Sequence, residues 1–205
     1  MYIMNFDKAF DTTIGHEGGF TLNKNDAGNW TGGKVGVGQL KGTKYGIAAN
    51  SYPNLDIKNL TLDQAKAIYK RDYWDKAKCD LLPEGLKFHV FDVSVNSGVS
   101  RSIKTLQQAA GVKDDGIIGP NTLAAIKAID EKELLLRFYS FRISFYTSLS
   151  SFSNFGKGWM NRVANNLKNR VRIILSLALA VNMIGCTAHS IKNNIHVVVC
   201  VQCVN

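Results

Sequence analysis

The sequence predicts a mainly α-helical protein with one small β-hairpin element near its N-terminus. Apolar residues recur at helical spacing along most of residues 5–170. Residues 18–50 differ, because they are rich in glycine, asparagine, threonine and lysine. Residues 171–205 differ again, because they carry two strongly apolar runs. We therefore expect a helical body, interrupted once by irregular β structure, and a separate tail.

The first predicted helix begins near Asn5, whose side chain suits the N-cap position. Its apolar face is formed by Phe6, Phe10 and Ile14. Gly18 and Gly19 are expected to end it, because glycine accepts the left-handed conformation that follows a helix. This prediction places Glu17 at the helix C-terminus.

Residues 18–50 predict an irregular β-hairpin or small sheet with long loops. Weak alternation is carried by Val35, Val37 and Leu40. Loop-rich segments carry function more often than core. This segment is therefore expected to hold functional residues.

Two further helices follow from local patterns. Thr61 and Gln64 form a capping-box pattern that begins a predicted helix over 61–71. Residues 86–96 are apolar on nearly all sides, which predicts a central buried helix.

Later helices are predicted from their first residues. Ser100 is expected to cap one helix, and Pro120 suits the first position of another over 120–129. Asp130 and Glu133 form a second capping-box pattern at the start of a long helix. The apolar residues of that helix are Leu134, Phe138, Phe141 and Phe145. A last helix is expected from 159 to about 170.

The chain is basic, with 25 Lys and Arg against 16 Asp and Glu and a net charge of +9. The basic residues are scattered and match no nucleic-acid motif, so no nucleic-acid partner is expected. A solvated basic surface and attraction to another polyanion both stay open. The four cysteines do not form a disulfide framework pattern, because only Cys79 precedes residue 170.

Three residues suggest glycosidic bond cleavage: Glu17, Asp26 and Thr43. This chemistry needs an acid that protonates the leaving oxygen and a group that stabilises the transition state or positions water. The partial negative charge at a helix C-terminus would favour the protonated form of Glu17. Asp26 is a candidate for the second carboxylate, and Thr43 could hold a water molecule.

The chain resembles the glycoside hydrolase family 108 lysozymes, which are endolysin-type N-acetylmuramidases. The resemblance covers about residues 5–170 and rests on six segments in order: HEGGF (16–20), DAGN (26–29), GTKYGIA (42–48), DVSVNSG (92–98), DGIIGPNTLAAI (115–126) and FGKGWMNRV (155–163). The last two are similar to the peptidoglycan-binding type 3 domain of that family. Two departures stand out. Ala27 replaces the usual proline, and residues 28–39 lengthen the loop before Thr43.

The resemblance implies a lysozyme-like α+β catalytic part over 5–97 and an α-helical wall-binding module over 98–170. It makes Glu17 the catalytic acid, Asp26 the turn aspartate and Thr43 the cleft threonine. The implied reaction is hydrolysis of the β-1,4 bond between N-acetylmuramic acid and N-acetylglucosamine, for phage-type lysis or for wall remodelling during secretion. Two alternatives remain: a lytic transglycosylase, and a non-catalytic wall-binding protein that assists secretion.

Four more residues are candidates for substrate binding. Trp30 and Tyr45 lie in the loop region and could stack on sugar rings, whereas Trp74 and its neighbour Tyr73 are expected to pack in the core. The resemblance implies that Asp92 and Asn96 line the back of the cleft. A buried hydrogen-bonded pair that fixes helix packing is the alternative for these two residues.

The tail over 171–205 has open alternatives. Its first apolar run is shorter than a bilayer requires, so membrane contact at the interface and packing on the body both stay open. Cys186, His189, Cys200 and Cys203 have zinc-like spacing but no recognisable finger, and we expect neither a metal nor another cofactor. The first residues lack a signal-peptide pattern. We therefore expect cytoplasmic synthesis, a holin-like export partner, action on the periplasmic or extracellular wall, and a monomer with peptidoglycan as its partner.

Overall fold

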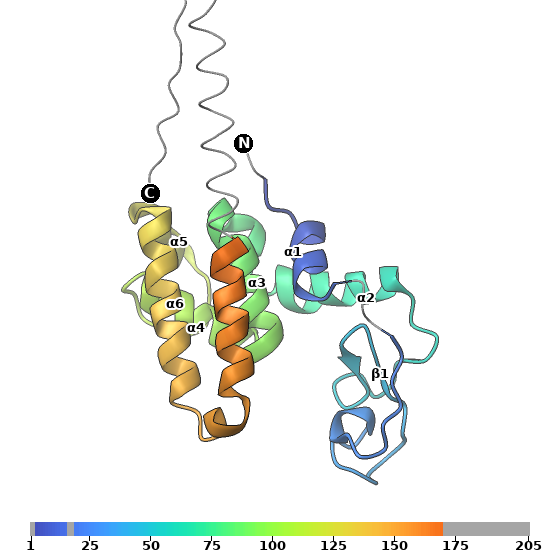
Figure 1. Ribbon diagram of the computed structural model, residues 1–205. Helices are drawn as coiled ribbons and strands as arrows, with labels where there is room; N and C mark the ends of the chain where they lie inside the picture. Colours follow the sequence, from blue (N-terminus) through green and yellow to red (C-terminus); the bar gives the residue numbers. More distant parts are fainter. Residues whose placement is uncertain (1–2, 16–18, 170–205) are drawn as a thin grey trace, which may run out of the picture. The chain divides into compact units, whose positions relative to one another are not determined.

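Helices make up most of the computed structural model, which describes residues 3–15 and 19–169 (Figure 1). The helices are α1 (Phe6–Thr13), α2 (Leu62–Tyr69), α3 (Glu84–Ser97), α4 (Val99–Ala109), α5 (Pro120–Ala128) and α6 (Glu131–Thr147). A further helical segment covers 152–169. Residues 3–157 form one compact unit, and a second unit includes 158–169. The mainly α prediction, with one small antiparallel hairpin, is confirmed.

Helix α1 begins as predicted and ends earlier. The Asn5 side chain accepts a hydrogen bond from the Lys8 backbone N–H at 3.1 Å. The helix stops at Thr13, and Gly15 takes the left-handed conformation at φ 67°. The predictions that Gly18 and Gly19 end this helix and that Glu17 lies at its C-terminus are therefore wrong, because the helix ends at Thr13 and Gly15 already supplies the positive φ.

The β structure is one hairpin with two residues in each strand. Strand β1 (Thr43–Lys44) pairs with β2 (Ile47–Ala48), with Thr43 opposite Ala48. The two turn residues, Tyr45 and Gly46, both have positive φ, as a tight hairpin turn of this kind requires. The Tyr69 hydroxyl donates to the Tyr45 carbonyl oxygen at 3.1 Å and so fixes the turn to α2.

The weak alternation at Val35 and Val37 does not mark a strand. These side chains are 55% and 48% exposed, and the segment closes on itself as a loop. The Thr31 N–H donates to the Gln39 carbonyl at 2.9 Å, and the Gly32 N–H donates to the Val37 carbonyl at 3.1 Å. The lengthened loop before Thr43 is therefore closed by hydrogen bonds between its own residues.

The predicted capping box of α2 is confirmed. The Thr61 hydroxyl accepts from the Gln64 N–H, and the Gln64 side chain accepts from the Thr61 N–H. Helix α2 continues directly into a π-helical segment, η2 (Lys70–Asp75). This continuation carries Trp74 into the core, where it is fully buried as predicted.

Aromatic rings join α1, η2 and α3 in the core. Phe6 contacts both Trp74 and Phe91 edge-on, with ring centroids 5.8 and 5.9 Å apart. Trp74 and Phe91 contact each other at 5.7 Å. Helix α3 is buried over most of its length, which confirms the predicted central helix. It packs against α1, α4 and α6 (Figure 1).

The junction between α3 and α4 depends on glycine rather than on a serine cap. Helix α4 begins at Val99, and its N-cap is Gly98, with φ 89° and ψ 149°. Ser100 lies inside the first turn, so the prediction that it caps this helix is wrong. The chain changes direction at a backbone conformation that only glycine adopts readily.

Helix α6 departs from its predicted pattern in two ways. Asp130 caps it by accepting from the Lys132 and Glu133 N–H groups, but the Glu133 carboxylate accepts from Arg137 in place of a reciprocal cap bond. Phe141 is 40% exposed, so it does not belong to the buried face. That face carries Leu134, Leu135, Phe138, Tyr139, Arg142 and Tyr146.

A turn held by a buried glutamine connects α4 and α5. Gln107 donates to the Asp115 carboxylate at 2.8 Å and to the Ile117 carbonyl at 3.0 Å, and it accepts from the Gly116 N–H at 2.8 Å. The first of these bonds is the main reason that the pKa of Asp115 lies below its usual value. The Asp-Gly turn and Pro120 at the start of α5 are therefore explained by local structure.

Candidate active site

Glu17 lies outside the described residues, so its neighbourhood is defined by the segments on either side. After the gap, the Thr21 N–H donates to the Thr43 carbonyl at 2.8 Å, and the Thr43 N–H returns a bond to Thr21 at 2.9 Å. The chain that follows Glu17 is therefore fixed directly to strand β1.

Asp26 is an exposed carboxylate held in one orientation. Its Oδ1 accepts from the Gly28 N–H at 2.9 Å, which makes it the N-cap of the short helix η1 (Ala27–Asn29). Oδ2 has no hydrogen bond within residues 3–15 and 19–169. The Asp26 side chain can thus present one oxygen to a ligand or a water molecule.

Asn29 joins this turn to Thr43. It is completely buried, and its Oδ1 accepts from the Thr43 hydroxyl at 2.7 Å while its Nδ2 donates to the Asn23 carbonyl at 2.9 Å. Its backbone N–H also donates to the Asp26 carbonyl at 3.1 Å. Asp26 and Thr43 therefore belong to one hydrogen-bonded unit, which we call the turn cluster: Asn23, Asp26, Asn29 and Thr43.

Trp30 and Tyr45 flank the turn cluster. The Trp30 indole N–H donates to the Lys24 carbonyl at 2.8 Å, and the Trp30 backbone forms a bridge with Leu40. Tyr45 is half-buried in the hairpin turn, and the Lys44 ammonium lies 5.5 Å from its ring centroid. Both rings keep partly exposed surfaces close to Asp26 and Thr43 in the chain.

Asp92 and Asn96 lie apart from the turn cluster, on α3. Asp92 is 1% exposed, and its Oδ2 is 2.7 Å from Nη2 of the fully buried Arg142 on α6. Asn96 is exposed, and its side-chain amide donates to the Asp92 backbone carbonyl at 2.6 Å. The geometry agrees with the structural alternative for Asp92, because its carboxylate pairs with a buried cation.

The sequence interpretation missed the residues that hold the candidates in place. Asn29 is visible in the sequence only as the end of a turn motif, and Arg142 only as a polar break in the aromatic pattern of α6. Besides the Asp92–Arg142 pair, a second buried pair joins α3 to α6: Nδ1 of His89 is 2.7 Å from the Tyr139 hydroxyl. No local signal identifies these residues, because their partners lie 14 and 50 positions away.

A single carboxylate, Asp72, links the loop after β2 to η2. The Asp72 carboxylate accepts from Arg71 at 2.6 Å, from the Tyr52 hydroxyl at 3.0 Å, and pairs with Lys76 at 3.1 Å. The bond from Arg71 is the largest cause that holds the pKa of Asp72 well below its usual range. Burial, followed by the charge of Tyr73, raises the pKa of Tyr52.

Metal ligands do not gather in the described part of the chain. No group of three or more His, Cys, Asp or Glu side chains is placed to hold an ion there. The cysteine and histidine residues of the tail, with their zinc-like spacing, lie outside that part. Within the same ranges, no helix has the length and apolar character needed to cross a membrane.

The comparisons with known proteins cover both parts of the chain. Residues 10–98 match the family model of glycosyl hydrolase 108, and residues 101–164 match a model described as a predicted peptidoglycan domain. The solved structure of SagA from Brucella abortus is similar, with 30% sequence identity and a TM-score of 0.67. The similarity covers 82% of this chain and 94% of SagA. No curated protein matches.

The fold and these matches define a glycoside hydrolase that carries a peptidoglycan-binding domain. The chain belongs to glycosyl hydrolase family 108. The protein therefore binds peptidoglycan, and it acts at the bacterial cell wall. The expectation of a glycoside hydrolase is confirmed.

Proposed function

We propose that the protein is an N-acetylmuramidase that hydrolyses the β-1,4 bond between N-acetylmuramic acid and N-acetylglucosamine. The observation that carries the proposal is the turn cluster, in which a buried asparagine ties Asp26 and Thr43 together. The segment that follows Glu17 is paired with Thr43 itself. Three polar residues with complementary roles in glycoside cleavage are thus connected through short backbone and side-chain links.

In the proposed reaction, Glu17 donates its proton to the bridging oxygen as the bond from that oxygen to the anomeric carbon breaks. Positive charge develops on the sugar ring, and the ionised Asp26 stabilises it or accepts a proton from the attacking water. Because the Thr43 hydroxyl donates its proton to Asn29, its oxygen keeps acceptor capacity for a water or a sugar hydroxyl.

Substrate contacts are assigned to the partly exposed rings of Trp30 and Tyr45 and to the exposed Asn96. Rings of this kind pack against sugar faces while their polar edges stay hydrated. Asp92 has a different role in this proposal. Since its carboxylate is buried against Arg142, it supports the α3 backbone from which Asn96 projects.

The deciding experiment is digestion of purified peptidoglycan by the wild type and by Glu17→Gln, with products analysed by mass spectrometry. Glu17→Gln removes the acidic proton and keeps the shape, so we expect cleavage to fall at least 100-fold, the contribution typical of a general acid. Wild-type fragments should carry reducing N-acetylmuramic acid ends. Products with 1,6-anhydro ends would instead identify a lytic transglycosylase.

A matched control is Glu133→Gln, which makes the same chemical change on the exposed surface of α6. Glu133 pairs only with the equally exposed Arg137 within the described ranges, so this variant should digest wall like the wild type. Retention of full activity by Glu17→Gln would contradict the assignment of the acid.

We further propose that the protein acts in phage-type lysis or in wall remodelling during secretion. In either setting a holin-like partner would open the route to the wall, and the domain division at residues 97 and 98 would separate cutting from wall attachment. Support comes from the pairing of a glycoside hydrolase family match with a peptidoglycan-binding match in one chain.

A further inference from the structure

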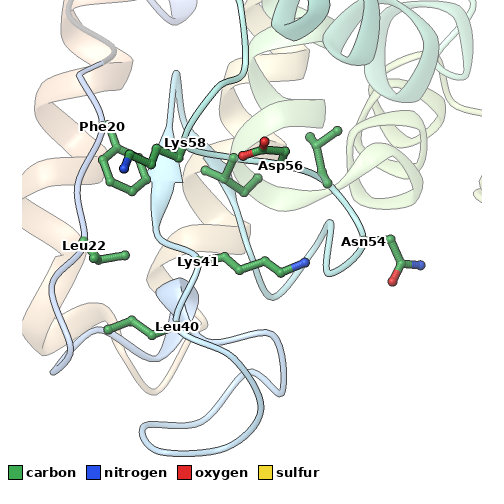
Figure 2. A pocket seen from close by; sticks show the side chains of 9 residues that line it. Phe20, Leu22, Leu40, Lys41, Asn54, Asp56 and Lys58 are labelled. Carbon is green, nitrogen blue, oxygen red and sulfur yellow. The ribbon is translucent and has the colours of Figure 1, made fainter.

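An open pocket lies between the segment over 20–22, the residues just before strand β1 and the loop over 54–58. It has a volume of about 400 Å³, which lies within the usual size range of small-ligand sites. Figure 2 shows Phe20, Leu22 and Leu40 along one side, with the Lys58 side chain reaching toward Phe20, and Lys41, Asn54 and Asp56 along the other. The lining residues are Phe20, Leu22, Leu40, Lys41, Asn54, Leu55, Asp56, Ile57 and Lys58.

The pocket adjoins the segment that pairs with strand β1. Phe20 and Leu22 flank Thr21, whose backbone pairs with Thr43. The Phe20 ring packs so closely on Gly42 that a Cβ atom there would lie 2.8 Å from Phe20 Cε2. Phe20 also follows Glu17 by three positions, and three residues span at most about 11 Å. A ligand in this pocket therefore lies within reach of a sugar at the cleavage point.

The walls of the pocket offer apolar surface. Phe20 is 36% exposed and Leu22 is 50% exposed, although both are large hydrophobic side chains. Such surface suits methyl groups better than the hydroxyl-covered edge of a sugar. Leu40 lines the same side, as Figure 2 shows.

The rim of the pocket offers positive charge. The exposed Lys58 ammonium has no hydrogen bond or ion pair within residues 3–15 and 19–169, whereas Lys41 donates to the Pro53 carbonyl at 2.6 Å. The carboxylate of Asp56 accepts from Asn59, through Nδ2 at 2.9 Å and the backbone N–H at 3.3 Å, and it also interacts electrostatically with both lysines. Lys58 is therefore the group best placed to receive an anionic ligand.

We propose that this pocket binds the stem peptide of the substrate. The inference rests on the proposed function, in which N-acetylmuramic acid lies at the cut bond and its lactyl group carries the peptide. A stem peptide combines alanine methyl groups with carboxylates, so it matches both the apolar wall and Lys58. In a peptide-bearing chain the lactyl carboxyl is consumed in the amide bond to the peptide, so the carboxylates that can meet the ammonium group belong to the stem peptide.

The test compares two soluble substrates freed of teichoic acid: glycan chains with intact stem peptides, and the same chains stripped by an amidase, with the lactyl carboxylate that the amidase frees converted to its methylamide. Cleavage is measured as release of reducing ends, and kcat/KM is determined for each. Wild-type enzyme should cut the peptide-bearing chains about tenfold faster, as expected for one charge-assisted contact and its apolar neighbours. Lys58→Glu should lose this preference while keeping its rate on stripped chains.

Two further variants make the result specific. Lys34→Glu makes the same charge change at an exposed lysine outside the pocket, and it should keep the tenfold preference. Leu22→Ser removes apolar wall without changing charge, and it should reduce the preference. Thermal melting checks that each variant is folded.

Each outcome separates this proposal from the proposed function. Equal wild-type rates on both substrates, or an unchanged preference in Lys58→Glu, would overturn the pocket assignment and leave the muramidase intact. Failure of the wild type to cut either substrate would overturn the muramidase and the pocket assignment together.

Discussion

The buried pair of Asp92 and Arg142 is the most consequential contact between single residues. Both side chains are essentially inaccessible, at 1% and 0% exposure, so each charge depends on the other for stabilisation. Arg142 also donates to the Tyr146 hydroxyl through Nε at 3.2 Å. Removal of the carboxylate would leave a buried cation without its counter-charge, which is far more costly than the loss of an exposed pair.

We expect Asp92→Ala to lower the free energy of unfolding by about 3–5 kcal/mol. For a chain of this size the melting temperature should fall by roughly 10 °C. The double variant Asp92→Leu with Arg142→Met should recover most of that loss, because neither charge remains. Urea and thermal denaturation measure both, and a double variant no more stable than Asp92→Ala would contradict the electrostatic explanation.

Predictability at this scale follows the distance between partners in the chain. The Asn5 and Thr61 caps were predicted, because each bonds a backbone group three positions away. Asn29 was not recognised as the organiser of the turn cluster, because it bonds Thr43 only after the loop has folded. The roles of Asp26 and Thr43 were taken from the family resemblance, and they stay predictions.

Glycines set the limits of helices α1 and α4 more than capping side chains do. Gly15 ends the first helix, whereas the sequence pattern favoured Gly18 and Gly19. Gly98 ends α3, as the glycine pattern predicts, but it also stands at the N-cap of α4, where the pattern favoured Ser100. A run of several glycines and serines does not reveal which one takes the positive φ, since that depends on how the next element packs. The helices themselves were predicted, because their apolar spacing is local.

We expect Gly98→Ala to cost about 1–3 kcal/mol, the usual penalty for a side chain in this backbone region. No atom lies within 4 Å of the position that the new Cβ would take, so strain rather than collision causes the loss. Ser100→Ala is the matched control and should change stability by less than about 0.5 kcal/mol, because Ser100 caps nothing. Chemical denaturation would refute this explanation if both variants were equally stable.

The stability of the whole molecule should depend on acid pH through carboxylates that the fold keeps ionised. The pKa of Asp72 is lowered chiefly by Arg71, and that of Glu84 is lowered by Lys87 and the Met4 N–H in spite of partial burial. A carboxylate whose pKa is lower in the folded state than in the unfolded state stabilises the protein at any pH above its unfolded-state pKa. This stabilisation is lost as the pH falls through the folded-state pKa.

The melting temperature should therefore be nearly constant between pH 7 and about pH 5 and fall progressively below about pH 4, where unfolded carboxyl groups take up protons. Asp72→Asn should melt lower than the wild type at pH 7 and lose less on acidification. Melting curves across this range test the point, and an equally steep acid loss in Asp72→Asn would remove Asp72 as a cause.

The placement of the Asp92–Arg142 pair has a consequence for recombination. Asp92 lies within the segment that matches the hydrolase family, and Arg142 lies within the segment that matches the peptidoglycan domain. An exchange of one segment for that of another lysin would import a helix without the complementary charge. Chimeras joined between residues 98 and 101 would therefore need both members of the pair, or neither, to avoid an unpaired charge in the core.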